Sequence, residues 1–296
     1  MKTAQNLTFL AFLVLPLTLI GQVPSTDIYL FDVVPSDGHY SVRNMVKVTD
    51  REGYDNQPFF HPDGKGLLFT SIRDTNQTDI YYYDFATKRT SQITRTHESE
   101  YSPMISPDGK LLTVVRVELD STQRIWRMKP DGTKAKPLME SVKDVGYYCW
   151  LNKKTLAVWT VRDTTLSIVT IKDQVLKPVA KGAGRSFHLS PSGTKLVYLK
   201  LDLETDAHRM MLHNFVSGTT DTLIVTFEGE QDIAFHRDGE LLMGHQGVIY
   251  SMLPGQDTEW REWADLNNHG AGNFYRLALS ADGKKLAVVA YHGSKP

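Results

Sequence analysis

A turn motif that recurs along the chain is the feature that most limits how it can fold. The stretch SPDGKLLTVV at residues 106–115 returns in variant form as HPDGKGLLFT at 61–70 and as SADGKKLAVV at 280–289. Aligning the repeats on the turn residue gives six anchors with successive spacings of 45, 44, 40, 46 and 44 residues: Asp63, Asp108, Asn152, Ser192, Asp238 and Asp282. A near-constant period of this length predicts a repeat architecture.

Each repeat has room for four short strands. In the second repeat an apolar strand at 103–105 precedes the turn at 107–110, and another apolar strand at 111–115 follows it. Proline fixes φ in such a turn, aspartate caps local N–H groups and glycine tolerates positive φ. An aromatic or branched third strand, as at 80–83, and a weaker fourth strand, as at 92–94, complete the unit. Four strands in about 40–45 residues, with no helical periodicity between them, are typical of a β-propeller blade.

The last repeat lacks its two outer strands, and the N-terminal region supplies two that match. The segment DIYLFD at 27–32 copies the third-strand segment DIYYYD at 79–84, and residues 45–49 copy a fourth strand. We therefore predict that N-terminal strands complete the blade whose inner strands come from the C-terminus, which leaves no free sheet edge at the closure. The predicted fold is all-β: one six-bladed β-propeller with four-stranded antiparallel blades over residues 22–296.

The N-terminal residues 1–21 are typical of a signal peptide. Met1-Lys2 precedes an uncharged apolar run at 7–20, which is too short to span a bilayer comfortably and is interrupted by Pro16. The alternative is an uncleaved membrane anchor. Cleavage would leave a periplasmic or secreted chain without a transmembrane span. Cys149 is the only cysteine, so no intrachain disulfide forms.

Composition and motifs exclude several classes of function. The formal net charge is −1 and no basic stripe is visible, which argues against binding to nucleic acid or to an anionic membrane surface. The nucleophile motif G-x-S-x-G and the zinc motif H-E-x-x-H are both absent from the sequence. We therefore predict no catalytic residues and no cofactor, with bound Ca²⁺ as an alternative.

The repeats, from SPDGK through the apolar strand to DIY, resemble the WD40-like (PD40) repeats of the TolB-type propeller family. The resemblance covers nearly all of residues 22–296 and is clearest at 54–130. It extends to the propeller part only, because TolB also has an N-terminal α/β domain. The resemblance implies an exported, monomeric, non-catalytic scaffold that recognises a protein or peptide partner of the cell envelope at the channel mouth. Two alternatives stay open: a metal-dependent polysaccharide lyase similar to oligogalacturonate lyase, and a relative of the propellers that gate prolyl-oligopeptidase-type hydrolases.

Carboxylates recur at one position of the repeat. Counting eight residues back from the six anchors reaches acidic side chains in four cases: Asp55, Glu100, Asp144 and Glu230. This register predicts an acidic collar at the mouth of the channel, where it would bind a basic peptide or a hard cation such as Ca²⁺. The alternative is that these carboxylates cap backbone N–H groups where the first strands begin.

Two histidines are candidates for a metal site. His97 lies beside Glu98 and Glu100 in the connection between two repeats, and His188 lies in a predicted inner strand. Imidazole and carboxylate groups together bind transition metals. No fixed ligand spacing accompanies these histidines, so the sequence leaves the metal site as a hypothesis.

Overall fold

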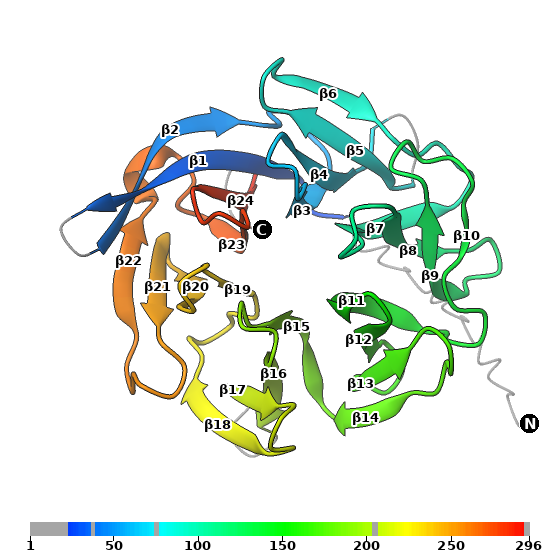
Figure 1. Cartoon of the computed structure of the whole chain (residues 1–296). Helices are drawn as coiled ribbons and strands as arrows, with labels where there is room; N and C mark the ends of the chain where they lie inside the picture. The colour runs from blue at the N-terminus through cyan, green and yellow to red at the C-terminus, as the bar shows by residue number, and fades with distance from the viewer. Residues whose placement is uncertain (1–22, 37–38, 74–76, 203–206, 293–296) are drawn as a thin grey trace, which may run out of the picture.

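Six four-stranded antiparallel sheets form a closed ring around a central channel (Figure 1). The computed structural model describes residues 23–36, 39–73, 77–202 and 207–292. The predicted six-bladed propeller is confirmed. The first strand of each blade lies nearest the channel, so its residues decide what the channel presents. The predicted signal peptide lies outside the described residues.

The first five blades follow the chain in order. Their strands are β3 (Asp55–Phe60), β4 (Gly66–Ser71), β5 (Asp79–Asp84) and β6 (Arg89–Gln92); β7 (Ser99–Ile105), β8 (Leu112–Val117), β9 (Gln123–Met128) and β10 (Lys136–Pro137); β11 (Val145–Asn152), β12 (Thr155–Thr160), β13 (Thr165–Thr170) and β14 (Lys177–Ala180); β15 (Ala183–Leu189), β16 (Lys195–Asp202), β17 (Ala207–Asn214) and β18 (Thr220–Val225); β19 (Ile233–Phe235), β20 (Leu241–His245), β21 (Val248–Met252) and β22 (Arg261–Asp265). The fourth strand that we expected at 92–94 is β6, which ends at Gln92.

The sixth blade joins the two ends of the chain, as predicted. Its strand order is β2 (His39–Lys47), β1 (Thr26–Ser36), β24 (Lys285–Tyr291) and β23 (Phe274–Leu279). β1 pairs with β24 from Thr26 opposite Tyr291 to Asp32 opposite Lys285. The hairpin of β1 and β2 also reaches the fifth blade, where the Tyr40 hydroxyl donates a hydrogen bond to Asp238 over 2.9 Å. The ring is therefore closed by backbone hydrogen bonds and by side chains.

The repeated turn has the geometry that its sequence predicts. Gly109 adopts a φ of 74°. The Ser106 hydroxyl donates to Asp108 over 2.7 Å, and the Lys110 N–H donates to the same carboxylate over 3.3 Å. These bonds lower the pKa of Asp108, led by the one from Ser106. The same arrangement recurs in the last repeat, where the Ser280 hydroxyl donates to Asp282 over 2.6 Å. The motif repeats because each blade needs the same tight turn between its first two strands.

Bulges interrupt the first strands beside the channel. Register shifts occur between Asn56 and Phe59 in β3 and between Tyr101 and Met104 in β7, and β11, β15 and β23 contain comparable shifts. A bulge redirects side chains and frees backbone groups from the ladder. The Ser102 N–H, in the β7 bulge, donates to the side chain of Gln57 over 2.8 Å. The bulges thus link neighbouring blades and place polar groups at the channel.

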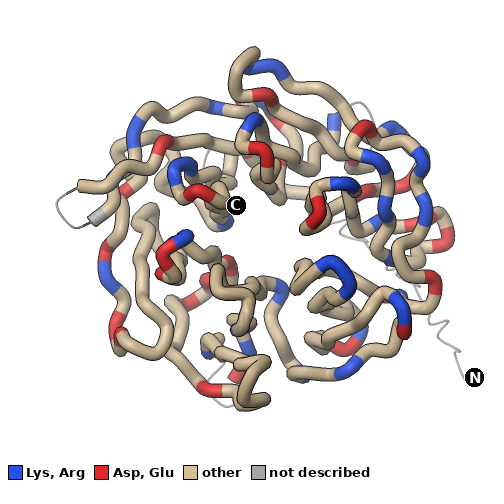
Figure 2. The backbone as a smooth tube through the Cα atoms, viewed as in Figure 1, with Lys and Arg blue, Asp and Glu red and all other residues tan. Residues whose placement is uncertain are grey.

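Apolar side chains fill the spaces between blades. Phe31 of the closing blade and Phe69 of the first blade are fully buried. Lys, Arg, Asp and Glu residues are interspersed around the ring, and the view in Figure 2 shows no stripe of a single sign. No helix in the described ranges is long and apolar enough to cross a membrane.

Candidate functional site

A cavity of about 990 Å³ occupies the centre of the ring and is lined by the first strands of the blades. Much of its wall is apolar and includes Phe59, Phe187, Phe235 and Leu279. The lining reaches Pro62, Pro191 and Asp282, which belong to the repeated turns. The cavity therefore extends to the face of the ring that carries these turns.

A cluster of charged side chains centred on the buried Asp232 lies among the polar groups that line this cavity. The carboxylate of Asp232, just before β19, accepts from Arg185 Nη2 of β15 over 3.0 Å and from Arg276 Nε of β23 over 3.1 Å. The Asp232 side chain is only 10% exposed. Burial opposes its ionisation, but the charges of Arg276 and Arg185 prevail and lower the pKa of Asp232. One aspartate thus holds two guanidinium groups from two other blades.

The two arginines differ in how many hydrogen bonds their guanidinium groups donate to neighbouring side chains. Arg276 also donates from Nη1 to Asn56 Oδ1 over 2.9 Å, and the Asn56 amide donates to the Tyr275 hydroxyl over 2.5 Å. Arg185, in contrast, has a buried Nε without a hydrogen-bond partner, and 36% of its side chain is exposed. Arg276 therefore joins Asp232 to Asn56 within the protein, whereas Arg185 has an N–H group that no protein group in the described ranges accepts.

The two histidines proposed as metal ligands lie in different places. His188 lines the cavity, where burial lowers its pKa to about 4, so its imidazole is neutral at pH 7. His97 is exposed in the connection between β6 and β7. Among the described residues, groups of three possible metal ligands occur at Asp27, Asp50 and His292 and at His236, Asp238 and Glu240. Neither group contains His97 or His188, so the metal site stays a hypothesis.

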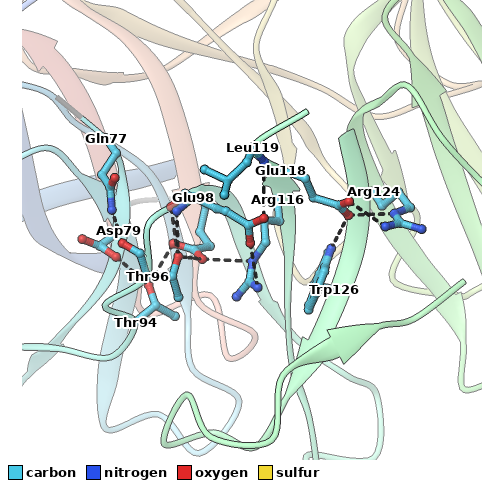
Figure 3. A network of polar contacts seen from close by, with 11 residues as sticks. Gln77, Asp79, Thr94, Thr96, Glu98, Arg116, Glu118, Leu119, Arg124 and Trp126 are labelled. Atoms are coloured by element: carbon cyan, nitrogen blue, oxygen red, sulfur yellow. Dashed lines mark hydrogen bonds and ion pairs between the residues drawn. The ribbon is translucent and has the colours of Figure 1, made fainter. Parts of the chain in front are cut away.

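Two of the predicted collar carboxylates are fully buried at the ends of first strands away from the repeated turns. Asp55 accepts from the Ser71 hydroxyl over 2.5 Å and lies 3.3 Å from Arg51 Nη1. Glu100 accepts from the Thr96 hydroxyl over 2.7 Å and lies 3.0 Å from Arg116 Nε. Figure 3 shows the polar network that includes Thr96 and Arg116. Each carboxylate thus contacts one side chain from the second strand of its blade and one from the connection before its first strand.

The other two collar carboxylates are more accessible. Asp144 is 44% exposed and lies 3.4 Å from Arg162 Nη2, and Glu230 is 19% exposed and lies 3.4 Å from His245 Nδ1. Each of the four thus lies beside a local side chain, whereas the capping alternative expected backbone N–H groups as partners. No two of them share a candidate metal group within the described part of the chain. Ligand binding at the collar stays a prediction.

Glu100 is expected to make stability depend on pH. Burial outweighs its hydrogen bonds and Arg116 and raises its pKa from 4.5 to about 7. The folded chain therefore retains a proton that the unfolded chain releases, and stability present below pH 4.5 is lost as the pH rises towards 7. Replacing Glu100 with glutamine removes this loss. Relative to the wild type, the variant gains up to about 3 kcal/mol between pH 4.5 and pH 8.

Urea unfolding of the wild type and of Glu100→Gln at pH 4.5 and at pH 8 checks this result. A difference in unfolding free energy that stays the same at the two pH values would show that Glu100 is ionised throughout. In that case its pairing with Arg116 would outweigh its burial.

The sequence interpretation overlooked the charge cluster, although the repeat register contains it. Asp232 and Arg276 each lie six residues before an anchor, and Arg185 lies seven residues before one. Gln57 and Ser102, which join the first two blades, occupy the same position as Asp232. Reading one residue past the collar position would have found Arg185, and reading two residues past it would have found Asp232 and Arg276.

Comparison with solved structures places the fold among TolB-like propellers. A protein from Agrobacterium tumefaciens, provisionally assigned as TolB, superposes with a TM-score of 0.66 at 16% identity over 91% of this chain and 99% of its own. TolB from Acinetobacter baumannii gives a TM-score of 0.58 at 14% identity over 90% of this chain and 64% of its own. At these identities the likeness shows the fold alone.

An enzyme shares the same architecture. Oligogalacturonate lyase in complex with manganese gives a TM-score of 0.58 at 11% identity over 86% of this chain and 82% of its own. No protein-family model matches the chain. Curated relatives match over only part of their length. The match covers 46% of the length of one relative at 25% identity and 10% of the length of another at 37% identity. The chain is therefore a six-bladed propeller whose structural neighbours include TolB-like proteins.

Proposed function

We propose that this protein is a non-catalytic binding protein that holds a peptide segment of a partner protein in its central cavity. The observation that carries the proposal is the cavity of about 990 Å³, with apolar walls and one buried charge cluster. Apolar walls with a few fixed polar groups are the usual composition of a ligand site. This proposal moves the binding site from the predicted acidic collar to the channel itself.

The closed ring suits such a role physically. Backbone ladders in six sheets hold the cavity walls, and the bulges fix the polar groups between blades. A preformed site loses little conformational entropy when it binds, so more of the contact energy appears as affinity. An extended peptide is narrow enough to enter a channel and offers alternating side chains to its walls.

We place this function outside the cytoplasm, in the periplasm or after secretion. The support is the N-terminal sequence, where a basic start and a short apolar run at 7–20 are typical of an export signal. The partner is proposed to be a protein of the cell envelope, bound by a monomeric propeller.

Peptide capture by the purified protein tests the proposal. The full chain is incubated with a pool of N-acetylated random hexapeptides, and bound peptides are identified by mass spectrometry. Leu189 lines the cavity and is half-buried, whereas Val216 is 82% exposed. Leu189→Gln is expected to weaken capture about tenfold, because it removes one apolar contact from the wall. Val216→Gln, the matched control, should capture as the wild type does.

The collar prediction is tested in the same assay. A double variant, Asp144→Asn with Glu230→Gln, removes the two accessible collar charges. Loss of capture in this variant, with Leu189→Gln unaffected, would return the site to the collar and contradict the cavity proposal. Thermal unfolding of every variant confirms that the compared proteins are folded.

A further inference from the structure

We propose that the segment bound in the cavity ends in a free carboxylate, and that Arg185 receives this group. The inference rests on the proposed function and names the chemistry of its ligand: the C-terminus of a partner chain with apolar side chains beside it. The observations that carry it are the charge balance of the cavity, the accessible Arg185 side chain held by Asp232 and the order of groups along the channel.

The charge balance of the cavity favours one negative charge. Its charged lining residues are three arginines and two aspartates: Arg185, Arg237, Arg276, Asp232 and Asp282. Three positive and two negative charges leave one positive charge. His188 adds none, because its lowered pKa of about 4 keeps the imidazole neutral at pH 7. One carboxylate balances this excess, whereas a phosphate dianion would reverse it.

Arg185 is the arginine with capacity for a ligand. Arg185 Nη2 donates a hydrogen bond to the Asp232 carboxylate, which fixes the position of the guanidinium group. The buried Nε has no partner, and a guanidinium carries five N–H donors in a planar fork that matches a carboxylate. Arg276 is committed to Asp232 and Asn56. An incoming carboxylate would pair with the Arg185 side chain, which lines the cavity and is 36% exposed.

The order of residues along β15 indicates how the ligand lies. Arg185 is followed in the cavity lining by Ser186, Phe187, His188 and Leu189, and then by Pro191 in the turn. The apolar members Phe187, Leu189 and Pro191 lie towards the turn, and the His188 imidazole among them is uncharged at pH 7. A chain that enters from the turn face therefore meets apolar walls before it reaches the guanidinium group. This arrangement suits a chain terminus, where apolar side chains precede the carboxylate. Burial of the surrounding groups strengthens the charge-assisted hydrogen bonds.

Two peptide pools of the same composition test the inference. Both contain N-acetylated random hexapeptides; one ends in a free carboxylate and the other in a carboxamide. The wild-type protein is expected to retain the free acids about tenfold better than the amides. Arg185→Gln is expected to lose this preference and still retain amide peptides through the apolar walls. Arg185→Lys, which keeps the charge, should restore part of the preference.

Arg209→Gln is the matched control, because Arg209 also pairs with an aspartate, Asp202, but lies on β17 away from the cavity lining. It should keep the wild-type preference. Equal retention of acids and amides by the wild type would overturn the carboxylate inference and leave the proposed function standing. Selection of internal Asp or Glu from the amide pool would assign Arg185 to a side-chain carboxylate and contradict the terminal one. Retention of neither pool would contradict the proposed function.

Discussion

Replacing Asp232 with asparagine is expected to lower the unfolding free energy by about 3–5 kcal/mol, because it leaves two arginines without their shared counter-charge. Arg276 is only 11% exposed and lies 3.1 Å from the Asp232 carboxylate. Arg185 lies 3.0 Å from the other carboxylate oxygen. Urea unfolding at pH 7 measures the loss.

The pH dependence of the same variant gives a second readout. The folded pKa of Asp232 is lowered, so its stabilisation is present above the unfolded value, near 4, and is lost as the pH falls through the folded pKa. Asp232→Asn should lack this part of the acid destabilisation. As a control, Asp202→Asn removes the partner of the 41% exposed Arg209 and should cost no more than about 1 kcal/mol. An Asp232→Asn protein as stable as the wild type at pH 7 would refute the ion cluster.

Replacing Phe31 with alanine is expected to destabilise the ring by about 3–5 kcal/mol, because it leaves a cavity in the closing blade. Phe31 lies in β1, is fully buried and belongs to a cluster that includes Trp263 of the fifth blade and Val288 of β24. It therefore supports both the N-terminal strand and the junction between the last two blades. Denaturant unfolding measures the change.

Val216→Ala is the control for this prediction, because Val216 is 82% exposed and its truncation should change stability by less than about 0.5 kcal/mol. If Phe31→Ala were as stable as Val216→Ala, β1 would not be part of the core of the ring. That result would contradict closure of the ring by pairing of β1 with β24.

The blades and the closure of the ring were predictable because short stretches of sequence determine both. A turn such as 107–110 fixes a hairpin by its own residue types, and the match between 27–32 and 79–84 identifies the strand that completes the last blade. These features depend on residues close together in sequence or on direct copies of them.

The candidate site was less predictable because it forms only when the ring closes. Arg185, Asp232 and Arg276 come from three blades, and bulges in β15 and β23 alter the register beside two of them. The collar position followed from counting, yet at Asp55 and Glu100 the side chains bind local hydroxyl and guanidinium groups. Spacing identifies equivalent positions but does not state which way each side chain turns.

The measurement that tests the central claim most directly is hexapeptide capture by the wild type and by Leu189→Gln. If the central cavity is the binding site, the wild type retains peptides, the cavity variant retains about tenfold less, and Val216→Gln matches the wild type. Equal capture by all three folded proteins would place peptide binding elsewhere on the molecule and contradict this account.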